Sequence, residues 1–139
     1  MEQEIPESLK VVRERAIDRP KYRGVLHAYC FFLSIPVGVT LIITSPSPRT
    51  SFAAAAFAFG ISSMLGISAL FHRTKFSDHD WMRFRRLDHI GIYLCIAGGY
   101  TPIGMLAVSG WVQKTLLITA WAGVAIGAII RFLPFDPPY

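Results

Sequence analysis

Residues 52–71 read FAAAAFAFGISSMLGISALF, and no side chain in this stretch is charged. A helix needs about 20 mostly apolar residues to cross the hydrocarbon core of a bilayer, so this stretch is long enough to span a membrane. Three other stretches of the chain are similarly apolar. The sequence therefore predicts an all-α membrane protein whose membrane domain covers 24–139, with four transmembrane helices over about 25–44, 52–72, 88–108 and 114–133.

The composition and the charge distribution favour the same class. Of the 139 residues, 53% are hydrophobic and 17% are charged, and the mean hydropathy is +0.43. Lysine and arginine are frequent before the first span and between the second and third, whereas the other two connections hold only Arg49 and Lys114. Because positive residues are retained in the cytoplasm, we expect both termini on the cytoplasmic side of the cell membrane. The net charge of +5 then indicates contact with the lipid bilayer and no nucleic acid.

The N-terminal segment, residues 1–23, has the pattern of an amphipathic helix. Basic side chains occupy one part of its surface, and apolar side chains fall on a single helical face at Ile5, Leu9, Val12 and Ala16. Helices of this kind lie in the membrane interface with their apolar side toward the lipid. We therefore expect an interfacial helix on the cytoplasmic surface ahead of the first span.

The connection between the second and third spans carries a helix-start signal. Ser77 and Asp80 fit a capping box, in which the side chains at the two ends of the first turn satisfy backbone N–H groups. This pattern predicts a short helix in the connection, separate from the third span. Its apolar residues Trp81, Met82 and Phe84 are available to face the bilayer.

Proline and glycine residues give further detail within the spans. Pro102 is expected to break the third span in its outer half, since proline lacks the N–H that continues a helix. Gly123 and Gly127 form a small-xxx-small pattern, which permits close contact between helices. Packing within the chain is the simpler interpretation of this pattern, and a dimer interface is the alternative.

Polar and ionisable side chains gather at the cytoplasmic end of the predicted helices. Ser68 and His72 are four residues apart and share one helical face near the end of the second span. Asp88 opens the third span from the same side, and His27 lies about one turn into the first. Imidazole is a zinc ligand, and carboxylate and hydroxyl groups can orient a zinc-bound water. The group is therefore compatible with a catalytic zinc site.

Each of these residues also has a simpler interpretation. His72 has the character of an amphipathic residue at a membrane interface, and Asp88 that of a dipole partner at a helix start or an ion-pair partner of a neighbouring arginine. His27 can face either the site or the interface. His89 directly follows Asp88, so on a helix it points about 100° away and is not expected to serve the same centre.

Four stretches of the chain match the motifs of one family in the right order. They are KYRGVLH at 21–27, SALFHR at 68–73, RLDHIGIY at 86–93 and IAGGYTP at 96–102. With these motifs the chain resembles the hemolysin III branch of the progestin and adipoQ receptor family. The resemblance covers most of the chain, and it departs from the family signature at Gly99, where the family has threonine.

The resemblance implies a seven-helix fold, of which this chain holds the first four helices, and a zinc ion held by one histidine of the second helix and two of the seventh. Carried over by motif, His72 is a zinc ligand, Asp88 holds the zinc-bound water and Ser68 supports them. No histidine follows His89, so the two remaining ligands are absent from this chain. We favour a truncated chain over a second chain that completes the site or a vestigial site, and we expect this chain alone to be inactive.

The leading functional hypothesis is a zinc-dependent hydrolase of lipid amides, in which a zinc-activated water attacks the substrate with Asp88 as the base. A non-enzymatic membrane-perturbing or receptor-like protein is the alternative. A small transporter is disfavoured because the spans lack a mid-bilayer charge to couple to ions. A haem-binding four-helix protein that uses His27 and His72 also remains open.

Overall fold

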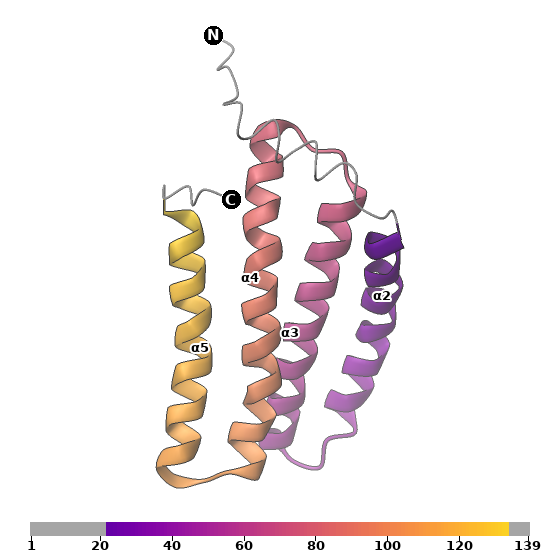
Figure 1. Cartoon of the computed structure of the whole chain (residues 1–139). Coiled ribbons are helices and arrows are strands. Elements are labelled where there is room, and N and C mark those ends of the chain that lie inside the picture. The colour runs from indigo at the N-terminus through magenta and orange to yellow at the C-terminus, as the bar shows by residue number, and fades with distance from the viewer. Residues whose placement is uncertain (1–21, 134–139) are drawn as a thin grey trace.

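The computed structural model describes residues 22–133, which form four long helices joined by short connections (Figure 1). The predicted amphipathic helix at 1–23 lies outside the described residues, except for the first residues of α2. No strand occurs in the described part of the chain. The elements are α2 (Tyr22–Ile43), α3 (Pro48–Arg73), α4 (Asp78–Pro102), the π-helical turn η1 (Ile103–Ala107) and α5 (Gly110–Phe132).

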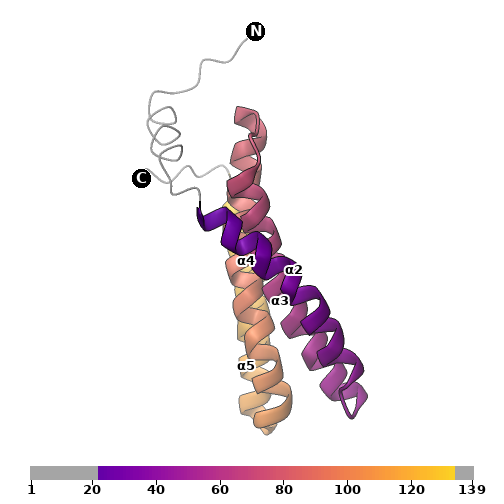
Figure 2. The ribbon, with the colours of Figure 1, turned by 90° about the vertical axis from the view of Figure 1, so that its right-hand side faces the viewer.

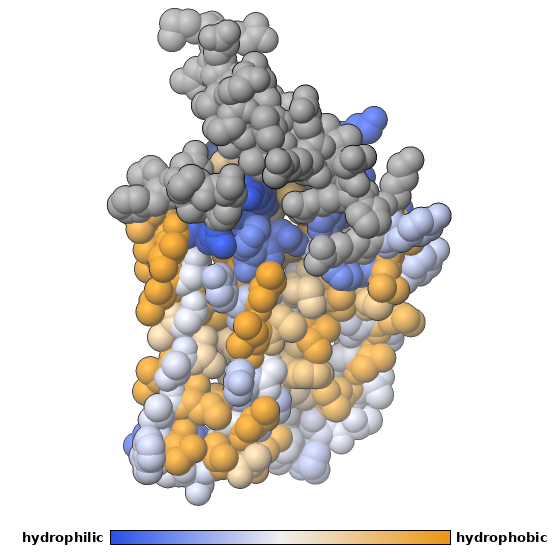
Figure 3. Space-filling model, in the orientation of Figure 1, coloured by the Kyte–Doolittle hydropathy of each residue, from blue (hydrophilic) through white to orange (hydrophobic). Residues whose placement is uncertain are grey.

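All four helices are long and apolar enough to cross a membrane, which confirms the predicted all-α membrane class. By length and composition, the four candidate spans within residues 22–133 are Gly24–Ile43, Pro48–Arg73, Asp80–Ala107 and Gly110–Phe132. In the space-filling view, a tall band of hydrophobic residues lies below the hydrophilic residues that gather at one end of the bundle (Figure 3). That is the end where α2 begins, α3 ends, α4 begins and α5 ends (Figure 1).

The helices stand side by side in chain order, and α2 and α3 are inclined to α4 and α5 (Figures 1 and 2). Helix α3 packs against both α2 and α4, whereas α5 packs against α4 and η1. Small residues make the contact between α3 and α4 close. A Cβ atom on Gly60 would lie 2.6 Å from the carbonyl oxygen of Leu94, and one on Gly98 would lie 2.7 Å from that of Ala56. In a membrane, such close backbone approach is a main source of helix association.

Helix α4 differs from the prediction at its start. The sequence predicts a short helix in the connection and a third span that begins near residue 88, but α4 runs without interruption from Asp78 to Pro102. The predicted capping box is present in part: the Ser77 side chain accepts a hydrogen bond from the backbone N–H of Asp80, but the Asp80 carboxylate accepts from the Ser77 hydroxyl and not from a backbone N–H. Neither glycine nor proline occurs between Ser77 and Asp88. Because nothing breaks this segment, the helix that begins at the cap continues into the span.

The aromatic residues at the start of α4 also depart in part from the prediction. Trp81 is one of three apolar residues available to face the bilayer, but its ring packs against Phe71 of α3 with the centroids 5.9 Å apart. Phe84 stacks on Phe76, with the ring centroids 4.2 Å apart. The continuous helix thus turns Trp81 toward α3, and Trp81 belongs to the interior of this end of the bundle.

The C-terminal end of the third span is held by polar contacts around Pro102. Helix α4 ends at this proline and continues as the π-helical turn η1, so the predicted break is a change of helix type. The buried hydroxyl of Thr101 donates to the carbonyl oxygen of Ala97 at 2.7 Å and accepts from the indole N–H of Trp121 at 3.1 Å. The Arg49 side chain donates to a carbonyl group of η1. These contacts join α3, α4 and α5 at that end.

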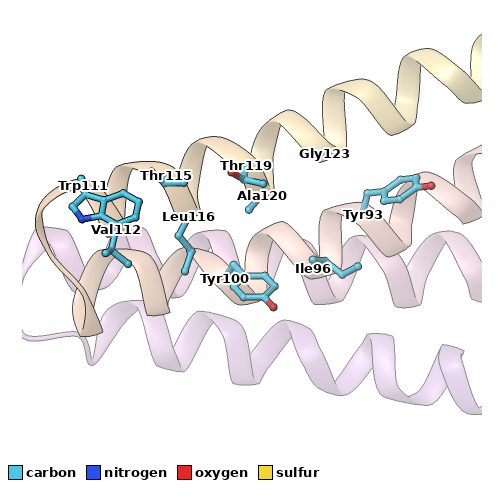
Figure 4. A pocket seen from close by; sticks show the side chains of 10 residues that line it. All are labelled: Tyr93, Ile96, Tyr100, Trp111, Val112, Thr115, Leu116, Thr119, Ala120 and Gly123. Carbon is cyan, nitrogen blue, oxygen red and sulfur yellow. The ribbon is translucent and has the colours of Figure 1, made fainter.

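The predicted small-xxx-small pattern of α5 has two separate roles. Gly127 is buried, and a Cβ atom there would lie 2.6 Å from the ring of Tyr93, so its packing within the chain is confirmed. A Cβ atom on Gly123 would meet nothing within 4 Å. Gly123 instead borders an apolar groove of about 560 Å³ between α4 and α5 (Figure 4). The other lining residues are Tyr93, Ile96, Tyr100, Trp111, Val112, Thr115, Leu116, Thr119 and Ala120.

Candidate functional site

A second cavity, of about 300 Å³, lies where the first turns of α2, the last turns of α3 and the first turns of α4 meet. The groove between α4 and α5 is lined by no described histidine, acidic or basic residue. The second cavity, by contrast, is lined by three histidines, an aspartate and an arginine, and it is therefore the candidate functional site. Its lining residues are His27, Met64, Ser68, Phe71, His72, Trp81, Arg85, Asp88, His89 and Ile92.

Helix α2 contributes His27, whose orientation the sequence left open. Its Nδ1 atom lies 2.9 Å from the Oγ atom of the buried Ser68, so His27 faces the cavity. The close approach of α2 to α3 depends on Gly24, since a Cβ atom there would lie 2.8 Å from the Cβ atom of His72. The glycine in the KYRGVLH stretch thus lets the first helix bring its histidine to the end of α3.

Helix α3 supplies Ser68 and His72, and both line the cavity as their four-residue spacing predicts. The His72 ring stands edge-on to the ring of Phe71, with the centroids 5.1 Å apart. The His72 side chain is half-buried beside other cavity residues. An interface role with the tip of the ring in water therefore does not fully describe its position.

Helix α4 places Asp88 inside the cavity, and not at a helix start. Because α4 begins at Asp78, Asp88 lies roughly three turns into the helix. The interpretation of Asp88 as a dipole partner of the helix N-terminus is therefore wrong. Its carboxylate shares the cavity with the imidazole of His72 and the hydroxyl of Ser68, so the three residues that the motifs single out are brought together.

His89 is a residue that the sequence reasoning excluded and the structure places in the site. It lines the same cavity as Asp88, although the two are adjacent in sequence. The α4 residues that line the cavity, from Trp81 to Ile92, fall within an arc of about 100° on the helix, with Asp88 and His89 at its two edges. The exclusion assumed a narrow site, whereas the cavity is wide enough to include both residues.

The wall of the cavity on α4 is ordered by two contacts that involve Arg85. The guanidinium carbon of Arg85 lies 5.4 Å from the centroid of the Trp81 ring, a cation–π arrangement. The Nδ1 atom of His89 lies 2.8 Å from the carbonyl oxygen of Arg85. Trp81 and Arg85 were not predicted as site residues, since the sequence interpretation placed them in a separate helix.

The described residues do not by themselves fit a zinc ion. Within residues 22–133, no group of three or more histidine, cysteine, aspartate or glutamate side chains is arranged to hold a metal. A catalytic zinc requires three protein ligands. Of the ligands that the family motifs imply, the described residues include only His72.

Comparison with known proteins identifies relatives. The profile of the family described as Haemolysin-III related matches residues 15–137. Hemolysin-3 of Bacillus cereus is 38% identical over 110 residues, which are 77% of this chain and 49% of the relative. The Hemolysin-3 homolog of Bacillus subtilis (strain 168) is 34% identical over 111 residues, which are 77% of this chain and 51% of the relative. The chain thus spans about half the length of these curated relatives, and no solved structure matches it.

Proposed function

The chain belongs to the Haemolysin-III related family, and we propose that its cavity is one part of a zinc-dependent site that hydrolyses lipid amides. The single observation that carries this proposal is the meeting of Ser68, His72 and Asp88 in one cavity, from two helices that are separate in sequence. Ionisable residues on membrane-spanning helices are rare and usually functional.

In this proposal, His72 is one zinc ligand and the other ligands come from outside the described residues. About half of each curated relative lies outside the matched segment, which is room enough for further ligands in proteins of this family. They belong either to a longer form of the polypeptide or to another chain. The cavity of this chain then supplies one side of the complete site.

The side chains of the cavity have separate roles in the proposed reaction. The Asp88 carboxylate accepts a proton from the attacking water, as a general base. Ser68 orients His27 through their hydrogen bond, and both keep the wall of the cavity polar on the α2 side. A lipid reaches this level from the surrounding bilayer, because the cavity lies at one end of four membrane-type helices. The amide bond of a lipid lies near its headgroup, at the same depth.

We also propose that the cavity faces the cytoplasm and that the protein lies in the cell membrane. Basic residues are concentrated at the cavity end, in the last turn of α3, the connection that follows and the first turns of α4, whereas the opposite end of these helices holds Arg49 and Lys114. Positive residues mark the cytoplasmic side of membrane helices. The N- and C-termini are cytoplasmic in this orientation.

The test is hydrolysis of an N-acylsphingosine in lipid nanodiscs by the protein expressed from its complete reading frame. Replacement of Asp88 by asparagine should lower the rate by about 100-fold or more, since general-base catalysis contributes at least that much. Asp80→Asn is the matched control, because Asp80 lies two turns earlier on α4 and its carboxylate accepts a hydrogen bond from Ser77 outside the cavity. Equal rates for the two variants, or no hydrolysis by the unaltered protein, would refute the proposal.

A membrane-perturbing function is the second candidate, and the names of the two Bacillus relatives favour it. Such a function would depend on insertion of the helices and not on the cavity. Dye release from liposomes by a variant with both His72→Ala and Asp88→Ala separates the two candidates. Release equal to that of the unaltered protein supports perturbation, and its loss in the variant points back to the cavity.

A further inference from the structure

We propose that His89 is a second proton-transfer group of the cavity, and that it protonates the amine that leaves when an amide is cleaved. The inference rests on the proposed hydrolase function and adds a residue to it. Asp88 and His89 lie at the two edges of the arc that α4 presents to the cavity. A bound amide can therefore meet a base on one side and an acid on the other.

The hydrogen bond of His89 fixes which ring nitrogen is available. A carbonyl oxygen can only accept, so the contact of 2.8 Å between His89 Nδ1 and the Arg85 carbonyl requires a hydrogen on Nδ1. The remaining ring nitrogen, Nε2, is then the atom that exchanges a proton with the contents of the cavity. Imidazole is the side chain best suited to this exchange near neutral pH.

The tautomer of His27 is less constrained than that of His89. The Nδ1 atom of His27 contacts the Ser68 hydroxyl, which can donate or accept, so either tautomer of His27 satisfies that bond. The partner of His89 is a backbone atom inside α4, one turn earlier, and the Arg85 side chain is itself stacked on Trp81. His89 therefore has a fixed tautomer on a rigid support, as a group that delivers a proton to a defined place requires.

The proposed steps balance as follows. The water oxygen forms a bond to the carbonyl carbon while Asp88 takes one of the water protons. The C=O π pair moves onto the carbonyl oxygen, and it forms the C=O bond again as the amine leaves. The C–N bond then breaks, its electron pair stays on nitrogen, and the nitrogen takes the proton from Nε2 of the His89 imidazolium. The carboxylic acid product returns a proton to His89, and Asp88 gives its proton to the free amine. Asp88 and His89 end in their starting states, and the products are a carboxylate and an ammonium ion.

The closing experiment compares two substrates that differ only in the leaving group. The first is an N-acylsphingosine, whose amine needs a proton to leave, and the second is a nitrophenyl ester of the same fatty acid, whose phenolate does not. The protein from its complete reading frame is assayed in nanodiscs with His89→Asn, which removes Nε2 and places an amide N–H where Nδ1 reaches the Arg85 carbonyl. We expect hydrolysis of the amide to fall by about 100-fold and that of the ester by less than about threefold.

The outcomes separate this inference from the function on which it rests. If the unaltered protein cleaves neither substrate, the proposed hydrolase function fails and the inference fails with it. If His89→Asn slows amide and ester equally while Asp80→Asn slows neither, the function stands and His89 has only a structural role. Recovery of amide hydrolysis in His89→Ala on addition of imidazole would support proton transfer, because a free imidazole cannot restore a backbone contact within the helix.

Discussion

Replacement of Ser68 by alanine tests whether the polar contact between α2 and α3 serves the site or merely joins the helices. Two hydrogen bonds between side chains of these helices are those of Ser68 with His27 at 2.9 Å and of Ser62 with Ser34 at 2.8 Å. Ser62 does not line the cavity, whereas Ser68 does. Ser62→Ala is therefore a matched control that removes the same kind of bond from the same pair of helices.

The expected loss of stability is similar for the two variants. An interhelical hydrogen bond in a membrane contributes on average about 0.6 kcal/mol to the free energy of unfolding, and about 2 kcal/mol at most. The two serines are six residues apart on α3, or roughly 9 Å along the axis. At that separation their effects should add, so we expect the double variant to lose about 1–3 kcal/mol.

The assay measures unfolding and hydrolysis on the same preparations. Unfolding is followed by helix content during titration of dodecyl maltoside micelles with sodium dodecyl sulfate, and hydrolysis with the N-acylsphingosine in nanodiscs. Both single variants should lose comparable stability, but only Ser68→Ala should lower the hydrolysis rate, by about tenfold or more, since supporting residues of metal sites typically have effects of that size. An equal effect of Ser62→Ala on the rate would refute the assignment of Ser68 to the site.

Three further predictions concern the close contacts between helices. Gly127→Ala should destabilise the protein by about 1–3 kcal/mol, because its new methyl group meets a tyrosine ring. Gly123→Ala should be neutral or stabilising, and denaturation in mixed micelles compares the two variants. Thr101→Val keeps the side-chain volume but removes the acceptor of the Trp121 indole N–H. The free energy of unfolding should fall by about 1–2 kcal/mol and the tryptophan emission should shift. Unchanged stability and emission would contradict the contact. Gly24→Ala should separate α2 from α3 at the cavity, and the distance between spin labels on the two helices should increase. A constant distance would show that this glycine does not limit the approach.

The sequence predicted the spans well because a bilayer imposes one strong requirement on composition and length. Each of the four apolar runs is a helix that is long enough to cross a membrane. The prediction failed where hydropathy and helicity diverge. Residues between Ser77 and Asp88 are too polar for the bilayer core, and their polarity indicated a connection with its own short helix. Because they lack a helix breaker, they extend α4 beyond the apolar region.

The site could be predicted in part for the same reason. The motif residues Ser68, His72 and Asp88 meet as expected, because helices that enter and leave at one end bring these positions to the same level. The orientation of His27 depends on the rotation of α2, which the contact of Gly24 with α3 sets and no local pattern reveals. His89 was missed because residues about 100° apart on a helix were not expected to serve one centre, whereas the cavity spans an arc of about that width on α4.

The most direct test of the central claim is the zinc content of the protein expressed from its complete reading frame, purified in detergent and measured by mass spectrometry of the metal. We expect stoichiometric zinc in the unaltered protein and in Ser62→Ala, and a loss of most of the zinc in His72→Ala. A zinc content that His72→Ala leaves unchanged would contradict the claim that this cavity is part of a zinc site.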